Sequence, residues 1–434
     1  NYRQERGKMA NQNNWLRNKD GMGIWEHRGK VAVAGWGQSH IDRRWDGVSM
    51  DRTMGAWCIQ ACLNALDDAG LTVDDIDGIF TSKETRLEQT WAPRPYFEPP
   101  YNTEDGLSFV TGEWIQNQMG LKNAQYFENN APPPWGLLPL AAQAVGDGLC
   151  KVALVYYPMG NYDGRYGHNN PNNFSDDVSG PSAFSVPWGY QSGAMMNNLV
   201  IYKQYCRRYN KSHDGLAPLA INNRRNGLKT PWSFYSLHEQ YQITMDDYLS
   251  ARVIMAPLRI FDCDRPVMNC GAYIITTAER AEAMKQPPVY ILNHATGPTI
   301  QRSTFQNLDE QQEQCAILAK RMWEGSGLGP KDVDVFNPYD GYLTFVQQYL
   351  EAFQWHGVGL GEAHDLYADD IRVEGPHPFN SSGGNNGTGR TRNALMYDCI
   401  QQLRGQAGER QVTVPCDIAV GGFGDMTMFS KHPS

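Results

Sequence analysis

The chain has 434 residues, 41% of them hydrophobic, which is enough to bury the core of one large domain or of two fused halves. A formal net charge of -9 argues against a general nucleic-acid-binding protein, and no run approaches the roughly 18 apolar residues of a membrane span. The nine cysteines include no C-x-x-C pair, which argues against a zinc ribbon or redox pair and favours reduced thiols in a cytoplasmic protein.

The first part of the chain alternates strand-like and helix-like segments after a polar N-terminal extension at 1–28. Apolar residues recur at helical spacing in several segments, and short apolar runs lie between them. Strands are expected at 30–37, 76–81, 123–129 and 151–157, and helices at 51–69, 107–119 and 135–147. This alternation predicts an α/β fold with buried, largely parallel sheets.

The middle of the chain, residues 158–285, is polar and aromatic and contains Asn-rich and Gly-rich stretches such as GNYDGRYGHNNPNNF. Helix-like pieces occur within it, including 245–256. We expect a long loop insertion at 158–250 that covers one end of the core, because loops of this length are usually functional or form interfaces. Its aromatic and Asn-rich part at 160–190 could wall a large apolar substrate or dock a partner. A Pro-, Trp- and Tyr-rich segment at 83–106 is a second expected active-site or interface loop.

The alternating pattern then restarts. Strands are expected at 289–293, 333–337 and 411–420, and helices at 308–324, 341–353 and 394–404. The segments GLTVDDID at 70–77 and GLGPKDVD at 327–334 share a glycine, a leucine and two aspartates, and each lies between a helix and a strand. This match indicates a duplication, with an N-terminal half at 29–285 and a C-terminal half at 286–434.

Two segments of the second half attract attention as a site. The stretch from His377 to Arg392, HPFNSSGGNNGTGRTR, joins a proline-bounded loop to a helix-like run. Gly-Gly permits backbone conformations that other residues avoid and lets a ligand approach the main chain. Amides that lead into a helix can point at an anion or a developing oxyanion. The second segment is NPYDGY at 337–342.

Two α/β halves, a long insertion and an N-x-x-G-G loop before the last helix resemble the thiolase superfamily. The resemblance covers roughly residues 30–430 and is carried by runs such as VAVAGWGQS, LNALDDAGLTVDDIDGIF, FNPYDGYLTF and NSSGGNNGTGR. It is closest to the branch that is similar to sterol carrier protein x and lipid-transfer proteins. It implies a five-layered fold of two βαβαβαββ halves and a homodimer.

The chain departs from the thiolase pattern at three positions. Pro133 stands near the place of the nucleophilic cysteine, Gly389-Arg390 replaces a Gly-His dipeptide, and Ala419 stands where a C-terminal cysteine is common. A thiolase needs a thiolate to hold an acyl group, and proline cannot supply one. The scaffold for binding an acyl-CoA remains.

The superfamily contains steroid side-chain aldolases, which lack this cysteine and cleave a β-hydroxyacyl-CoA by a retro-aldol reaction. Resemblance to them implies that this chain is a carbon–carbon lyase that releases a ketone and a shorter acyl-CoA. It also implies a small OB-fold subunit with a zinc ribbon, in an α2β2 assembly. The only cofactor expected on this chain is the coenzyme A of the substrate, and any zinc belongs to the partner.

The same resemblance assigns the catalytic residues. Tyr339 and Asp340 match a Y-D motif, and Arg390 occupies the position of a second catalytic residue. Tyr339 could take the β-hydroxyl proton if its phenol pKa, ordinarily about 10, were lowered by a cation such as Arg390. Asp340 could orient Tyr339 or cap the next helix.

Substrate-binding candidates follow from the two segments. Asn380, Gly383 and Gly384 could donate hydrogen bonds to the enolate oxygen, or Asn380 could cap the loop. Tyr342 could face the pocket or pack within a helix, and His294 could line the cavity or be a structural histidine. No metal ligand is predicted, because the histidines considered lack metal-like spacing. Two other functions stay open: an acyltransferase with a different nucleophile, and a non-catalytic acyl-CoA- or lipid-binding subunit.

Overall fold

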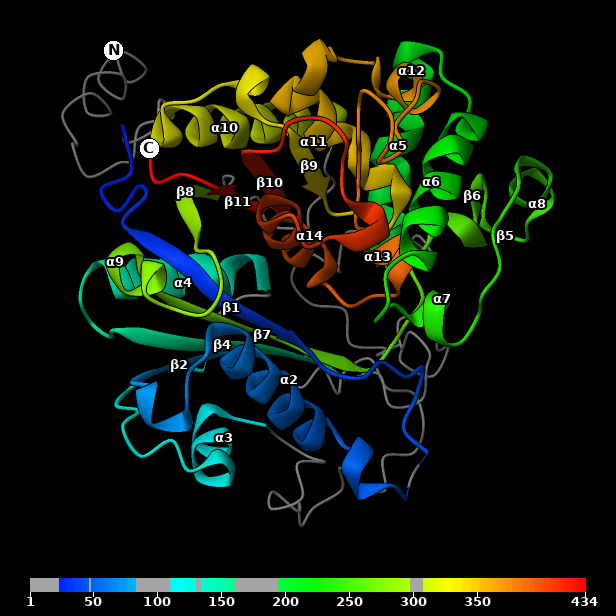
Figure 1. Ribbon diagram of the computed structural model, residues 1–434. Helices are drawn as coiled ribbons and strands as arrows, with labels where there is room; N and C mark the ends of the chain where they lie inside the picture. Colours follow the sequence, from blue (N-terminus) through cyan, green and yellow to red (C-terminus); the bar gives the residue numbers. More distant parts are fainter. Residues whose placement is uncertain (1–22, 47, 83–109, 130–133, 161–193, 297–306) are drawn as a thin grey trace, which may run out of the picture.

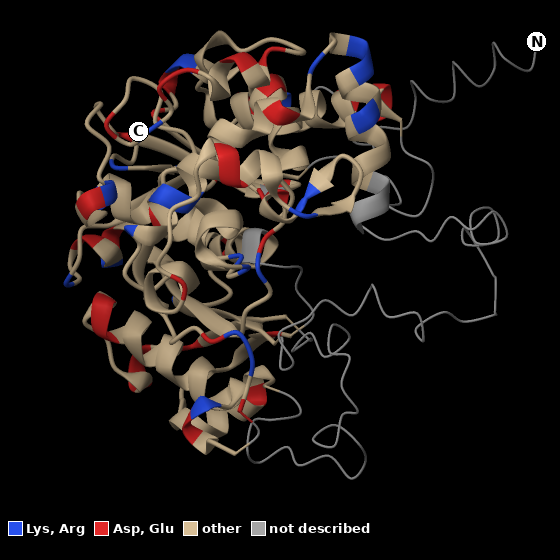
Figure 2. Cartoon of the chain, turned by 90° about the vertical axis from the view of Figure 1, so that its right-hand side faces the viewer, with Lys and Arg blue, Asp and Glu red and all other residues tan. Residues whose placement is uncertain are grey.

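A computed structural model describes residues 23–46, 48–82, 110–129, 134–160, 194–296 and 307–434. The expected loop at 83–106, most of the expected extension at 1–28 and a large part of the expected insertion lie outside these residues. No helix in the described ranges is long and apolar enough to cross a membrane. Figure 2 shows basic and acidic residues interspersed along the described chain.

The N-terminal half contributes five strands to one sheet. β2 runs parallel to both β3 and β4, whereas β7 runs antiparallel to β4 and to β1. The resulting order is β3-β2-β4-β7-β1. The strands are β1 (Val31–Gln38), β2 (Gly78–Thr81), β3 (Tyr126–Glu128), β4 (Val152–Met159) and β7 (Asn269–Thr277), and the helices among them are α2 (Met54–Ala69), α3 (Gly112–Met119), α4 (Pro134–Gly146) and, after β7, α9 (Ala278–Glu282).

The C-terminal half repeats this arrangement. Its strands follow the order β9-β10-β11-β8, with a parallel pair followed by two antiparallel pairs, as in β2-β4-β7-β1. A single parallel bridge between Phe336 and Phe379 stands where the first half has β3. The elements are β8 (Val289–Thr296), α10 (Leu308–Ser326), β9 (Val335–Pro338), α11 (Val346–Phe353), α12 (Ala363–Tyr367), α13 (Gly384–Thr388), α14 (Ala394–Arg404), β10 (Ile418–Phe423) and β11 (Asp425–Ser430).

The repeated sequence segment makes the same turn in both halves. α2 ends at Gly70 and α10 at Gly327, each in a left-handed conformation with φ of 73° and 71°. The Asp77 carboxylate accepts hydrogen bonds of 2.8–2.9 Å from the two amides that lead into β4. Asp334 accepts bonds of 2.8 and 2.9 Å from the two amides that lead into β10. In both halves the shared glycine ends a helix and the shared aspartate accepts hydrogen bonds from the amides that lead into a strand, which confirms the duplication.

The halves stack in five layers (Figure 1). Successive strand residues face opposite sides, so Leu154 contributes to a core cluster with α2 and α3, while Val155 contributes to one with α4 and α14. The cluster around α4 and α14 draws on both halves of the sheet. α10 and α11 cover the outer face of the second half. This arrangement confirms the predicted thiolase-like α/β fold, and β1 and β8 join the halves into one hydrogen-bonded sheet. The expectation of largely parallel sheets was wrong, because only β2 with β3, β2 with β4 and β9 with β10 pair in parallel, and the other described pairs of the sheet are antiparallel.

The segment between β4 and β7 lies over the second half. α5 contacts α10, and α6 packs against α13 (Figure 1). Its described elements are α5 (Ala194–Tyr209), α6 (Ala217–Leu228), α7 (Phe234–Leu237), α8 (Met245–Ser250) and a hairpin of β5 (Val253–Met255) and β6 (Leu258–Arg259). The helix expected at 245–256 is therefore α8 followed by β5.

The sequence analysis missed two strands, β7 and β11, and placed the start of β10 too early. β7 was hidden inside the polar middle region, although it is paired on both sides and almost fully buried. Its sequence NCGAYIITT begins with Asn, Cys and Gly, so it shows neither strict alternation nor a long apolar run. The strand expected at 411–420 begins only at Ile418, and β11 was not predicted.

Close packing of α6 against α13 depends on glycine. A Cβ on Gly227 would overlap the carbonyl oxygen of Gly387. We expect Gly227→Ala to lower the free energy of unfolding by about 1–3 kcal/mol, as overpacking generally does. The measurement is urea denaturation. Gly329→Ala is the matched control, since a Cβ there would lie 3.9 Å from its nearest neighbour; equal stability of the two variants would contradict the packing argument.

Candidate functional site

Tyr339 directly follows β9 and points into the protein. Its amide donates to the carbonyl of Gly422 at 2.9 Å, which continues the pairing of β9 with β10. The side chain is 6% exposed, and its ring lies 6.0 Å from that of Phe345. A Cβ on Gly341 would overlap the Tyr339 hydroxyl, so only glycine leaves room for the phenol in this position. The Y-D-G sequence therefore fixes the tyrosine.

Charged groups surround the phenol. The Arg390 Nε atom lies 3.8 Å from an Asp264 carboxylate oxygen, and both side chains are nearly buried. Burial raises the pKa of Tyr339, while the guanidinium groups of Arg390 and Arg392 oppose the rise and Asp264 adds to it. Tyr339 and Arg390 are thus brought together as predicted. The prediction of a lowered Tyr339 pKa was wrong, because desolvation outweighs the two cations.

Arg392 links the two halves at this site. It is 4% exposed and has a positive φ of 61°. Its guanidinium donates to the Tyr157 hydroxyl, at the end of β4, at 3.0 Å. Its amide donates to the side-chain oxygen of Asn385 at 2.7 Å, which holds the strained backbone in place. Residues 235 apart in sequence therefore meet beside Tyr339.

Asp340 ties the two candidate segments together. One carboxylate oxygen accepts from the Asn385 amide at 2.7 Å, and the other accepts from the Asn386 amide at 3.2 Å and from the Asn223 side chain at 2.9 Å. Asp340 thus caps α13 rather than the next helix in the chain. The buried carboxylate has its pKa raised to about 7 by desolvation, which these hydrogen bonds only partly oppose.

The two glycines of the loop serve packing. The Gly383 amide donates to the Asn380 carbonyl at 2.8 Å, and the Gly384 amide donates to the Ser382 hydroxyl at 2.7 Å. A Cβ on Gly383 would lie 2.5 Å from the carbonyl of Asn223, and one on Gly384 would overlap the Asp340 carboxylate. The prediction that these amides face an oxyanion is therefore not supported, because both donate within the loop.

Asn380 differs from its neighbours. It is fully buried with a positive φ of 49°, and its backbone carbonyl accepts from Asn226 at 3.2 Å. Neither polar atom of its side-chain amide has a hydrogen-bond partner in the structure as described. An unsatisfied buried amide costs about 1–3 kcal/mol, and such a group calls for a ligand, a water or a functional explanation. Of the candidate donors in the loop, Asn380 is the one with its amide available.

Of the remaining two substrate-binding candidates, one lies at the site and the other does not. Tyr342 lies at the site. Burial raises its pKa, the Arg390 guanidinium opposes this rise, and the Tyr339 phenol adds to it. His294 does not lie at the site. It lies on β8, three strands from β9 in the sheet, with its ring 5.2 Å from that of Trp25. Burial lowers the His294 pKa to about 4, as expected for a neutral structural histidine.

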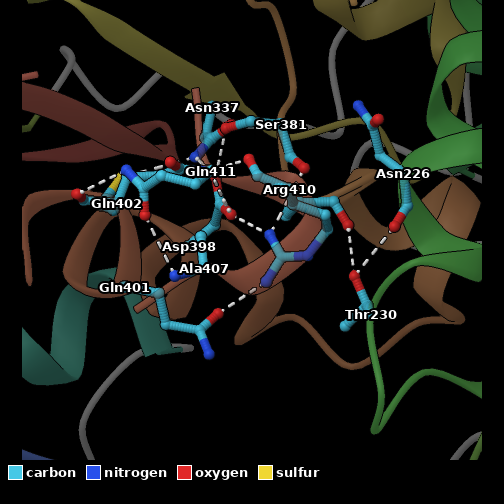
Figure 3. Close-up of polar contacts among 12 residues, drawn as sticks. Asn226, Thr230, Asn337, Ser381, Asp398, Gln401, Gln402, Ala407, Arg410 and Gln411 are labelled. Carbon is cyan, nitrogen blue, oxygen red and sulfur yellow. Dashed lines mark hydrogen bonds and ion pairs between the residues drawn. The ribbon is translucent and has the colours of Figure 1, made fainter. Parts of the chain in front are cut away.

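A buried ion pair supports the loop from behind (Figure 3). The Arg410 guanidinium contacts the Asp398 carboxylate, and each side chain is 1% exposed. Asp398 also accepts from the Ser381 hydroxyl and from the Asn337 side chain, the latter at 3.0 Å. Arg410 donates further to Gln401 at 2.7 Å. The network fixes the residue next to Asn380 and the strand that carries Tyr339.

Sequence reasoning missed Asp264, Arg392 and the Asp398–Arg410 pair. Asp264 lies in IFDCDRPV, where two aspartates interrupt an apolar stretch, and that pattern could have singled it out. Arg392 was noted only as part of the loop. Nothing in the local sequence indicates that Asp398 and Arg410 are buried partners, since their burial depends on tertiary contacts.

Asp340 should make stability depend on pH. Its folded pKa of about 7 lies above the ordinary value of 3.8, so the folded state binds its proton more tightly than the unfolded state. Relative to Asp340→Asn, the wild-type protein should therefore lose stability as pH rises from about 4 to about 7 and change little above that. Urea denaturation of both proteins across this range is the test. A difference in unfolding free energy that stays constant with pH would remove Asp340 as the titrating group.

Breaking the buried ion pair should be costly, whereas replacing it should not. We expect Arg410→Met to cost about 3–5 kcal/mol, because it leaves the Asp398 carboxylate buried without its cation. The double variant Asp398→Leu/Arg410→Met should recover most of that loss. Urea denaturation of the single and double variants measures both effects. Simple addition of the two single-variant costs would show that the charges do not act as a pair.

Comparisons with known proteins agree with this architecture. Residues 299–431 match the thiolase C-terminal domain-like family. The 17-hydroxy-3-oxo-4-pregnene-20-carboxyl-CoA lyase of Mycobacterium tuberculosis is 26% identical over 91% of this chain and 97% of its own length. A steroid side-chain-cleaving aldolase of Thermomonospora curvata is 24% identical over 82% and 85% of the two chains.

Solved structures agree at the level of the fold. The Ltp2-ChsH2(DUF35) aldolase superposes with a TM-score of 0.75 at 21% identity and covers 93% of this chain and 98% of its own. The acetyl-CoA acetyltransferase of Syntrophomonas wolfei superposes with a TM-score of 0.61 at 11% identity, over 93% of this chain and 99% of its own. With the duplicated five-layered fold, these comparisons confirm the resemblance: the chain has a thiolase-like fold, its residues 299–431 match the thiolase C-terminal domain-like family, and it is similar over most of its length to steroid side-chain-cleaving enzymes.

Proposed function

We propose that the chain is a carbon–carbon lyase that cleaves a bulky, steroid-like β-hydroxyacyl-CoA by a retro-aldol reaction, releasing a ketone and a shorter acyl-CoA. The main support for this proposal is that the Tyr339 phenol lies buried among Arg390, Arg392 and Asp264 at the end of β9. Support comes from the relatives, since the Mycobacterium protein is named as a lyase of a pregnene carboxyl-CoA and the Thermomonospora protein as a steroid side-chain-cleaving aldolase.

The thiols argue against the acyltransferase alternative. If another cysteine of the chain were the nucleophile of such an enzyme, it would act as a thiolate, which requires a low pKa. Burial raises the pKa of all nine cysteines in the chain, and desolvation is the largest cause at each. By the family resemblance, Pro133 stands near the position of the thiolase cysteine. An acyl-enzyme on sulfur is therefore disfavoured.

The proposed step balances as follows. The β-hydroxyl loses its proton, the bond between the α- and β-carbons breaks, and the β-carbon becomes the carbonyl of the ketone. The electron pair of that bond moves to the thioester oxygen as an enolate, which is then protonated at the α-carbon. The raised pKa of Tyr339 keeps the phenol protonated near neutral pH. Tyr339 therefore acts as a relay that accepts the substrate proton while passing its own to the Asp264 carboxylate.

The enolate needs donors and positive charge. The Asn380 amide, which lacks a partner within the described residues, supplies a hydrogen bond to the thioester oxygen. Arg390 stays protonated and offsets the negative charge that passes through the phenol. Asp340 holds the loop in position through α13 and takes no direct part in the chemistry.

The assembly is part of the same proposal. The chain forms a homodimer and joins a small OB-fold subunit, giving α2β2, in the cytoplasm. Support comes from the related Ltp2-ChsH2(DUF35) aldolase, whose name pairs two components. Coenzyme A enters with the substrate, and the zinc of a zinc ribbon would lie on the partner.

Turnover of a tertiary β-hydroxyacyl-CoA tests the function. With the chain co-produced with its OB-fold partner, chromatography should show the ketone and the shortened acyl-CoA. Tyr339→Phe should lower kcat by about 10²-fold or more, because the proton relay is lost. Arg390→Gln should move the pH–rate profile to higher pH, because the guanidinium lowers the Tyr339 pKa.

The controls separate this function from its alternatives. Tyr290→Phe, on β8, should leave kcat unchanged. Undiminished turnover by Tyr339→Phe would exclude the relay. A covalent acyl adduct, detected by mass spectrometry during turnover, would instead support the acyltransferase. Absence of both turnover and adduct would favour a non-catalytic acyl-CoA-binding subunit.

A further inference from the structure

Two histidines and an aspartate meet at the surface beyond the end of β1. His40 and Asp42 lie in an extended stretch, in which Asp42 pairs with Met268 as a β-bridge. Residues two apart in an extended chain point to the same side. His238 directly follows α7, and its Nε2 atom lies 2.8 Å from the carbonyl oxygen of Ile41. That contact places the second imidazole beside the first.

The three side chains lie too far apart for mutual hydrogen bonds, and the distance from Asp42 to His238 already matches that of two ligands on one ion, whereas His40 would have to move inward by a few tenths of an ångström. One Asp42 carboxylate oxygen lies 3.5 Å from the His238 Nε2 atom and 3.9 Å from the His40 Nε2 atom. These separations exceed normal hydrogen-bond lengths. Ligand atoms about 2.0–2.2 Å from a tetrahedral metal ion are themselves roughly 3.3–3.6 Å apart. The second Asp42 oxygen faces Arg52 at 3.6 Å, which leaves the first toward the imidazoles.

We propose that His40, Asp42 and His238 bind a divalent transition-metal ion of the zinc class. Two imidazoles and one carboxylate suit such an ion, with water in the fourth position. The side chains of His40, Asp42 and His238 are 42%, 16% and 32% exposed, so an ion can enter from solvent. On binding, His238 Nε2 exchanges its hydrogen bond to the Ile41 carbonyl for the metal, and the proton of the neutral ring moves from Nε2 to Nδ1.

Such an ion would fasten α7 to the end of β1, next to the candidate active site. Gly389 directly precedes Arg390, and a Cβ on this glycine would lie 3.1 Å from the Cβ atom of Phe234 in α7. The Arg390 amide donates to the Arg265 carbonyl at 2.8 Å, and the Arg265 guanidinium lies 5.5 Å from the Phe234 ring centre. The ion would therefore steady the surface against which Arg390 rests. The prediction of no metal ligand overlooked this group, since 196 residues separate Asp42 from His238.

Metal binding is tested directly on the full chain after treatment with a chelator. Titration with Zn²⁺ against a chromophoric competitor should reveal one ion per chain at this group, and Co²⁺ should give the visible absorption of a tetrahedral site. His238→Ala and Asp42→Asn should each weaken Zn²⁺ binding by at least about tenfold, the scale on which even outer-shell changes act. Zn²⁺ should also raise the Tm of the wild type but not of His238→Ala.

A second cluster supplies the control. Glu26, His27 and Asp147 also bring three potential ligand atoms together, and His27→Ala should leave the proposed site unchanged. Equal Zn²⁺ affinity in the wild type and His238→Ala would overturn the proposal, as would loss of the ion in His27→Ala alone. If His238→Ala does not fold, the more exposed His40→Ala gives the same readouts. None of these outcomes depends on lyase activity, so the metal site stands or falls independently of the proposed reaction.

Discussion

The burial of the Asp340 carboxylate against α13 is the constraint on which the site depends. A carboxylate can be buried only where enough donors replace its lost hydration. Here the donors are the Asn385 and Asn386 amides and the Asn223 side chain. Because Asp340 directly follows Tyr339, the same contacts that stabilise the carboxylate also determine where the phenol lies. The glycine-rich loop, α6 and the end of β9 are thereby joined at one point.

Duplication explains the scaffold but not the chemistry. The two halves share strand order, strand direction, helix-ending glycines and the aspartates that lead into β4 and β10. They differ beyond β9, where a single bridge at Phe379 stands in the place of a full strand. The chain released from the sheet there continues into the loop and α13. The site therefore lies where the second half has an irregular segment in place of a strand.

The sequence was informative wherever local physics decided the structure. α14 was predicted with its observed bounds because apolar periodicity and Gly405 mark it clearly. The pairing of Tyr339 with Arg390 was predicted from the family resemblance, not from spacing. The glycine loop was misjudged because glycine permits both ligand approach and close packing, and only the tertiary contacts of Gly383 and Gly384 decide between them. Burial of Tyr339 likewise reversed the expected direction of its pKa shift.

The bond between Arg392 and Tyr157 has a consequence for how the protein matures. Tyr157 is synthesised with the first half, whereas Arg392 emerges near the end of the chain. Contacts this distant in sequence form late, because they must first overcome the entropy of a long loop. A ribosome-bound chain that has completed only its first half therefore carries Tyr157 and Asp264 but lacks Tyr339, Asn380 and Arg390. The chain can therefore become active only once it is complete, and premature termination yields an inactive fragment.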